Sequence, residues 1–178
     1  MKTKFLVIVS IIGLLSCNSE VSEKEQLTQN ITKLENQLRK NDQLNESVAN
    51  QVIQAYKEYA DKFPNDSIAP DYLFKAGEVS IGLRQYTSAI SFLERLNEHH
   101  PKYAKAPECF FLIAFVYDAY LSRKGKAKEM YEKFIEQYPD HHFADDAKAS
   151  IEHMNMSDED LIKMFQEKAL EQGAGSTN

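Results

Sequence analysis

The chain has few residues that could form cross-links or tight loops. Its 178 residues include two cysteines and six glycines, and only one of the cysteines, Cys109, lies outside the N-terminal region. A single thiol cannot form an internal disulfide, so side-chain packing must hold the fold together. The scarcity of glycine excludes glycine-rich loops that bind phosphates or dinucleotides, and no nucleophile-elbow motif is present. We therefore expect neither an enzyme nor a bound cofactor.

The chain also lacks a long hydrophobic run and an excess of positive charge. Its apolar run at residues 5–15 is eleven residues long, whereas a membrane-spanning helix needs about 20. A basic start, a short apolar middle and a small-residue end follow the order of a secretory signal. Removing Lys2 and Lys4 with this signal changes the net charge from −6 to −8. This charge argues against nucleic-acid binding, because phosphates are neutralised by Lys and Arg.

The end of this segment resembles the lipobox of bacterial lipoproteins, with Leu14, Leu15 and Ser16 directly before Cys17. The resemblance implies a signal peptide over residues 1–16 and lipidation of Cys17, including a palmitate-like acyl chain. Two or more acyl chains hold a protein stably on a membrane. Asn18, rather than Asp, follows the cysteine, which implies an outer-membrane anchor facing the periplasm. The alternative is an ordinary signal peptide cleaved nearby, although no A-x-A-like end is present.

Three proline turns recur along the chain, at Pro64, Pro101 and Pro139, spaced 37 and 38 residues apart. Each proline is followed five residues later by alanine. Each is preceded, at twelve and eight residues, by a small and then a large apolar residue: Val52 and Tyr56, Ala89 and Leu93, Ala127 and Tyr131. Proline cannot continue a helix, so each one closes a helix before the next begins. This period predicts an all-α solenoid of stacked helical hairpins.

The pattern resembles the tetratricopeptide repeat (TPR), with Leu73 and Phe110 where the repeat usually has tryptophan. The resemblance covers residues 44–155 as a second-helix half repeat (44–63), two full repeats (70–101 and 107–139) and a final first helix (142–155). Three residues inserted after each proline, and one more near Gly125, would explain the long period. The proline-then-alanine turn is similar to that of BamD-type outer-membrane assembly lipoproteins and of CpoB-type TolA-binding periplasmic proteins.

Segments on both sides of the solenoid also have helical patterns. Residues 17–43 carry a short apolar seam of Leu27, Ile31, Leu34 and Leu38 in a polar sequence, which we interpret as a solvated helical spacer, with a coiled coil as the alternative. Residues 156–172 predict a helix with Ser157 as N-cap and an apolar stripe of Leu161, Ile162, Met164 and Phe165. We expect this helix to cap the solenoid, the alternative being that it fills the groove. Residues 173–178 are expected to be a disordered tail.

The TPR resemblance implies a partner-binding groove on the first helices of the hairpins. The groove candidates are the outward positions of these helices: Asp71, Phe74, Glu78, Ile81, Glu108, Phe111, Phe115, Asp118, Asp146, Ala149 and His153. Carboxylates beside apolar rings suit a partner segment that carries Lys or Arg next to Leu or Phe. The alternative is that the phenylalanines belong to the core or are covered by the C-terminal helix.

Two other features are open to a chemical interpretation. The histidine pairs His99–His100 and His141–His142 occupy equivalent turns, and we interpret them as solvated turns rather than as a metal site, because adjacent residues on a turn diverge. Cys109 is interpreted as a small packed side chain rather than a reactive thiol.

Together these features predict a lipid-anchored periplasmic TPR adaptor or scaffold. It would hold another cell-envelope protein through an extended or helical segment of that partner, in outer-membrane protein assembly or envelope maintenance. The alternative is a permanent structural subunit of an envelope complex without an open groove. The sequence leaves the partner and the oligomeric state open.

Overall fold

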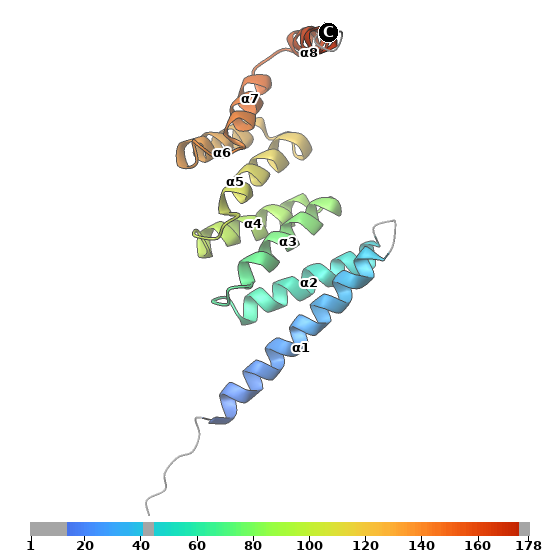
Figure 1. Ribbon diagram of the computed structural model, residues 1–178, viewed down its shortest axis with the longest axis vertical. Helices are drawn as coiled ribbons and strands as arrows, with labels where there is room; N and C mark the ends of the chain where they lie inside the picture. The colour runs from blue at the N-terminus through green and yellow to red at the C-terminus, as the bar shows by residue number, and fades with distance from the viewer. Residues whose placement is uncertain (1–13, 41–44, 175–178) are drawn as a thin grey trace, which may run out of the picture. The chain divides into compact units, whose positions relative to one another are not determined.

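The computed structural model describes residues 14–40 and 45–174, and within them the side chains except those of residues 14–21, 158, 168 and 171–174. The expected signal peptide through residue 13, the side chain of Cys17 and residues 175–178 of the expected tail therefore lie outside the described part. Every regular element in the described part is helical, as the repeat pattern predicts (Figure 1). The helices are α1 (Leu14–Arg39), α2 (Glu46–Lys62), α3 (Ala69–Gly82), α4 (Tyr86–His99), α5 (Ala106–Phe115), the π-helical segment η1 (Val116–Tyr120), α6 (Lys124–Gln137), α7 (Ala144–Met154) and α8 (Asp158–Ala174).

The chain forms two compact units, residues 1–79 and 80–178. In the described ranges no helix has the length and apolar character needed to cross a membrane. The helices follow one another as stacked repeats and form an all-α solenoid.

In the first unit, α1 packs along α2 (Figure 1). Ile31 and Leu34 of the apolar seam are buried, and α1 is the first helix of a hairpin whose second helix is α2. The interpretation of residues 17–43 as a solvated spacer is therefore wrong, and the solenoid begins before residue 44. Sequence reasoning undervalued the seam because it is short, but its side chains are covered by the apolar side of α2.

Polar contacts fix α1 at both ends of this hairpin. Near its C-terminal end, Glu35 accepts hydrogen bonds from Tyr56 Oη at 2.6 Å and from Lys75 Nζ at 2.8 Å. Nearer its beginning, Lys24 pairs with Asp66, and Lys62 Nζ lies 2.6 Å from Glu23 Oε1. The Glu23 pair is exposed and contributes little, so apolar burial is the main stabilising term.

The three proline turns share one backbone geometry. The helix before each proline ends two residues ahead of it, and the next residue donates its N–H to a carbonyl four residues back, at 2.7 to 2.8 Å. The alanine five residues beyond each proline begins the next helix and is buried. The residues concerned are Phe63, His100 and Tyr138 at the helix ends and Ala69, Ala106 and Ala144 at the helix starts. The repeat register predicted from the prolines is confirmed.

In the second unit, α4 packs against α5, α5 against α6, and α6 against α7. Small and large side chains alternate in its core, because alanine lets helix backbones approach and the rings fill the remaining space. Ala89 and Ala127 are fully buried, as the register predicts. One core cluster consists of Ala114, Ala127, Tyr131, Phe134, Ala144 and Ala147.

The extra residue of the longer repeat lies within a helix, and not near Gly125 as expected. The connection from α3 to α4 and that from η1 to α6 are both three residues long, 83–85 and 121–123. The residue is instead absorbed by η1, where the N–H of Leu121 bonds to Val116 O, five residues back, at 3.1 Å. Such π-helical turns accommodate single-residue insertions and often occur at functional sites.

The C-terminal helix α8 forms as predicted, with Leu161 and Met164 of its apolar stripe half-buried and the other two residues of the stripe exposed. Ile162 and Phe165 are each 57% exposed, and Phe165 has a ring contact with His153, at 6.1 Å between centroids. The stripe is therefore only partly covered, and whether α8 caps the solenoid stays a prediction.

Candidate functional site

The candidate site is the outward side of α5, η1 and α7, which we call the first-helix face. It consists of Glu108, Phe111, Phe115, Asp118, Asp146, Ala149 and His153. Phe115 and Asp146 are exposed and the other five are half-buried. All seven lie in the second unit, and the spacing of three and four residues keeps those of each helix on one side.

Two carboxylates of this face act on neighbouring titratable groups. Burial raises the pKa of Tyr131, a hydrogen bond with Ser150 lowers it, and the negative charge of Asp118 raises it. Burial and the neighbouring His142 lower the pKa of His141, while Glu108 opposes them. Asp118 is therefore close enough to influence Tyr131 of α6, and Glu108 is close enough to influence His141 in the turn before α7.

Phe111 is a half-buried residue of the face, and neighbouring rings cover part of its side chain. Its ring stacks on Phe143 with centroids 4.6 Å apart and planes at 18°, and it also contacts Tyr131 and Phe134 at 5.5 and 5.8 Å. It therefore packs on the core cluster and leaves only part of its surface for a partner. The alternative that the phenylalanines are core holds in part for this residue.

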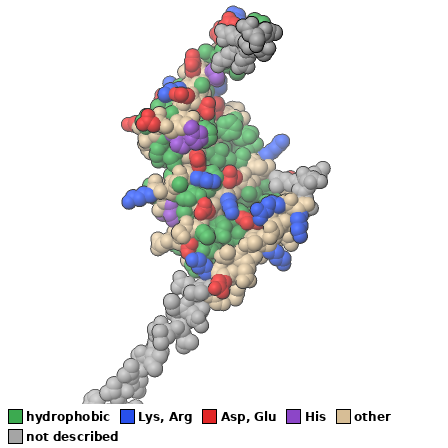
Figure 2. All heavy atoms as spheres, in the orientation of Figure 1, with side chains coloured by type: hydrophobic (Ala, Val, Ile, Leu, Met, Phe, Trp, Pro, Cys, Tyr) green, Lys and Arg blue, Asp and Glu red, His purple; other side chains and the backbone are tan. Residues whose placement is uncertain are grey.

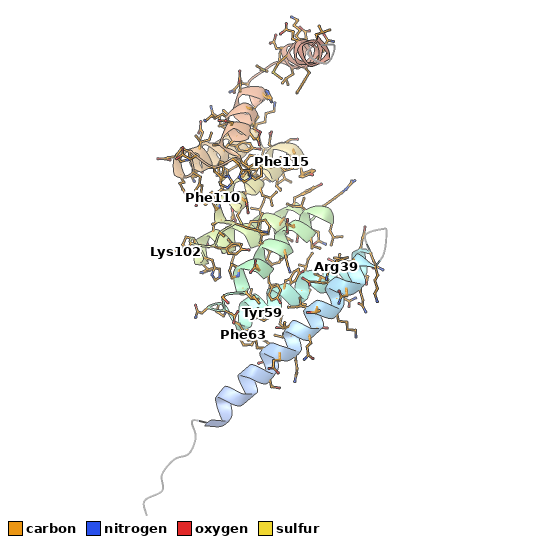
Figure 3. The ribbon with its side chains drawn as sticks, in the orientation of Figure 1. Arg39, Tyr59, Phe63, Lys102, Phe110 and Phe115 are labelled. Atoms are coloured by element: carbon orange, nitrogen blue, oxygen red, sulfur yellow. The ribbon has the colours of Figure 1, made fainter. Side chains whose placement is uncertain are left out.

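Phe115 belongs to an aromatic cluster that sequence reasoning missed. Its ring meets Tyr120 edge-on, at 5.6 Å and 88°, and Tyr120 stacks on Tyr86 at 4.6 Å and 8°. Figure 3 shows Phe115 near the end of α5, away from Phe110 near its beginning, and Figure 2 shows hydrophobic side chains reaching the surface of this unit. The signal in the sequence was the one-residue difference between the repeat spacings, since η1 places Tyr120 here.

The candidates from the preceding repeat, Asp71, Phe74, Glu78 and Ile81, lie on α3. Phe74 is only 7% exposed, so its prediction as a groove residue is wrong, because its helix turns this side chain into the interior. Asp71 and Glu78, which are half-buried and exposed respectively, lie with Phe74 in the first unit. Ile81 is half-buried in the second unit.

The histidine turn at His141 and His142 forms aromatic contacts. The His141 and His142 rings lie 4.2 Å apart, and His141 meets Phe134 edge-on at 5.5 Å. No group of three or more potential metal ligands occurs in the described ranges. The turn at His141 is therefore more packed than expected of a solvated turn. Cys109 is fully buried, consistent with a packed side chain.

Comparison with known proteins finds a likeness in the middle of the chain. The tetratricopeptide repeat family model matches residues 71–103 and 108–141, which correspond to the α3–α4 and α5–α6 hairpins with the turns that follow. A comparison with curated proteins gave no match. Tetratricopeptide repeats generally mediate protein–protein interactions. The two matched segments are thus similar to tetratricopeptide repeats, and this likeness suggests a role in protein interaction.

Proposed function

We propose that the protein is a lipid-anchored periplasmic adaptor that holds a segment of another cell-envelope protein on the first-helix face. The repeat matches support the interaction role, and the lipobox-like residues before Cys17 support the anchor. One observation carries the proposal. The exposed Phe115 and the half-buried Phe111 lie on a helix side bounded by the carboxylates Glu108 and Asp118.

This arrangement suits a segment with apolar side chains beside Lys or Arg. Burying one Leu or Phe side chain contributes about 1.5–3 kcal/mol, so the rings supply most of the affinity. Carboxylates at the rim of an interface chiefly set the rate of association, its salt dependence and the orientation of the partner. The half-buried Phe111 and Ala149 add partly exposed apolar surface that the segment would cover.

A charge-reversal pair on α7 tests the location of the site. Asp146 lies on the first-helix face, whereas the adjacent Asp145, with a side chain that is 93% exposed, does not. The probes are two fluorescent peptides of equal length, one of Leu and Lys and one of Leu and Glu. We expect saturable binding of the Leu/Lys peptide to the mature chain, residues 17–178. Asp146→Lys should weaken this binding about tenfold, a loss of ~1.4 kcal/mol, and Asp145→Lys should leave it nearly unchanged.

Three outcomes would contradict the proposal. Equal losses in the two variants would show that the peptide responds only to net charge. Equal binding of the Leu/Glu peptide would exclude recognition by the carboxylates. A folded chain that binds neither peptide would favour the permanent structural subunit.

A further inference from the structure

Two separate apolar surfaces of the second unit are open to solvent. Among the described residues of this unit, the exposed large apolar side chains are Phe115 and Tyr120 at the end of α5 and η1, and Ile162, Phe165 and Leu170 on α8. We call the first set, with the stacked Tyr86, the aromatic patch. Exposed apolar surfaces of this kind commonly mark interaction sites.

The sequence of α8 explains why it does not pack as the second helix of a fourth hairpin. A three-residue connection precedes it, as it does α4 and α6. The fourth residue of α4 and of α6 is a buried alanine, Ala89 or Ala127, but in α8 it is Leu161. The eleventh residue is the buried Leu96 or Phe134, but in α8 it is Lys168.

These two replacements oppose close packing of α8 on α7. A leucine overfills the contact that alanine makes, and a lysine is costly where the other repeats bury a large apolar side chain. The apolar side of α8 is therefore available to another surface.

The aromatic patch is bordered by positive charge. Arg84 lies two residues before Tyr86, and Arg123 and Lys124 lie just after Tyr120; all three are exposed. Because Tyr86 stacks on Tyr120, the two turns that carry these cations lie together. Asp118 is the nearby acidic residue in the same segment. By contrast, α8 has five acidic residues and two lysines, a net charge of −3.

We propose that α8 of one copy docks on the aromatic patch of a second copy. Ile162 and Phe165 would cover Tyr120 and Phe115, and the acidic helix would meet Arg84, Arg123 and Lys124. The contact is heterologous, because the helix of one copy meets a different surface, the patch, of the other copy. If each copy docks its α8 on the patch of the other, the two identical contacts form a closed two-fold dimer. The docked helix and a partner segment on the first-helix face would share Phe115, so we expect the two contacts to compete.

Complementation between two exposed-residue variants tests it. Phe165→Glu places a charge on the apolar side of α8. Gln166→Glu, at the next residue, makes the same change in charge and serves as the control. The double variant Tyr120→Ala with Arg123→Glu disrupts the aromatic patch. The mature chain is studied by sedimentation velocity over a broad concentration range, under reducing conditions so that cysteines do not link copies. Circular dichroism confirms that each variant is folded.

We expect the wild type and Gln166→Glu to form dimers that weaken with salt. Phe165→Glu and the patch variant should each dimerise about tenfold or more weakly. An equimolar mixture of these two variants should form a heterodimer, because one intact helix meets one intact patch. A wild type that is monomeric at every concentration would overturn the proposal and indicate that α8 folds back or binds another protein. A dimer that persists in Phe165→Glu, or a mixture that stays monomeric, would also overturn it.

Discussion

Replacing Ala127 by phenylalanine tests the packing on which the repeat register depends. Ala127 is fully buried in the cluster that contains Tyr131, Phe134 and Ala114, and it lies where α6 contacts α5 and α7. A ring has no free space there, so α6 must move or neighbouring side chains must leave their preferred rotamers. Overpacking of this kind costs about 1–3 kcal/mol, and occasionally more.

The effect is large enough to measure by thermal melting. For a chain of this length, 1 kcal/mol lowers the melting temperature by about 2–4 °C, so Ala127→Phe should lower it by about 2–12 °C. Urea unfolding followed by circular dichroism gives the free-energy change directly. The m-value should be unchanged, because the same surface is exposed on unfolding.

The neighbouring Lys128 provides the matched control. Its side chain is exposed and lies 3.8 Å from Glu132, a surface pair that contributes little. Lys128→Phe introduces the same ring without filling the core, and we expect a change within about 0.5 kcal/mol. Equal melting temperatures for wild type and Ala127→Phe would refute the packing argument.

Three further predictions concern other parts of the chain. Cys17→Ala should abolish fatty-acid labelling and leave uncleaved precursor, and continued labelling would end the lipoprotein proposal. Burial raises the pKa of Glu35, but hydrogen bonds from Lys75 and Tyr56 outweigh it and leave the pKa below its usual value. The Glu35 carboxylate therefore stabilises the fold at neutral pH, and this contribution is lost as the pH falls through the lowered pKa. In urea titrations Glu35→Gln should be less stable than wild type by about 1–3 kcal/mol at neutral pH, with the gap closing in acid; a gap that persists would contradict this. Asn45 accepts a hydrogen bond from the N–H of Val48 at 3.1 Å as N-cap of α2, so Asn45→Ala should cost about 1 kcal/mol and Asn45→Ser much less, and equal losses would exclude the capping role.

The helical repeat was predictable because its signals are local and recur. Proline ends a helix wherever it occurs in this register, and the alanine five residues later is needed at each helix start, so Pro64, Pro101 and Pro139 sufficed to set the register. The role of α1 was not predictable from its own residues. Its seam is too short to indicate a partner, and burial of Ile31 and Leu34 depends on α2.

The sequence predicted which side of each helix carries the candidate site, but not which of its residues are exposed. Helical spacing placed Glu108, Phe111 and Phe115 on one side of α5, but it could not distinguish the half-buried Phe111 from the buried Phe74 at the equivalent position one repeat earlier. That difference depends on what covers each helix. The aromatic patch was missed because η1 changes the helical phase after Phe115, and the sequence shows this only as one extra residue in the second spacing.

The central claim is that a partner segment lies on the first-helix face, and site-specific photo-crosslinking in cells tests it most directly. A photoreactive residue at Asp146, and separately at Glu108, would be compared with one at Asp145 on the adjacent side of α7. The account predicts a crosslink to the same envelope protein from positions 146 and 108 and none from position 145. Crosslinking from all three positions alike, or only from position 145, would contradict it.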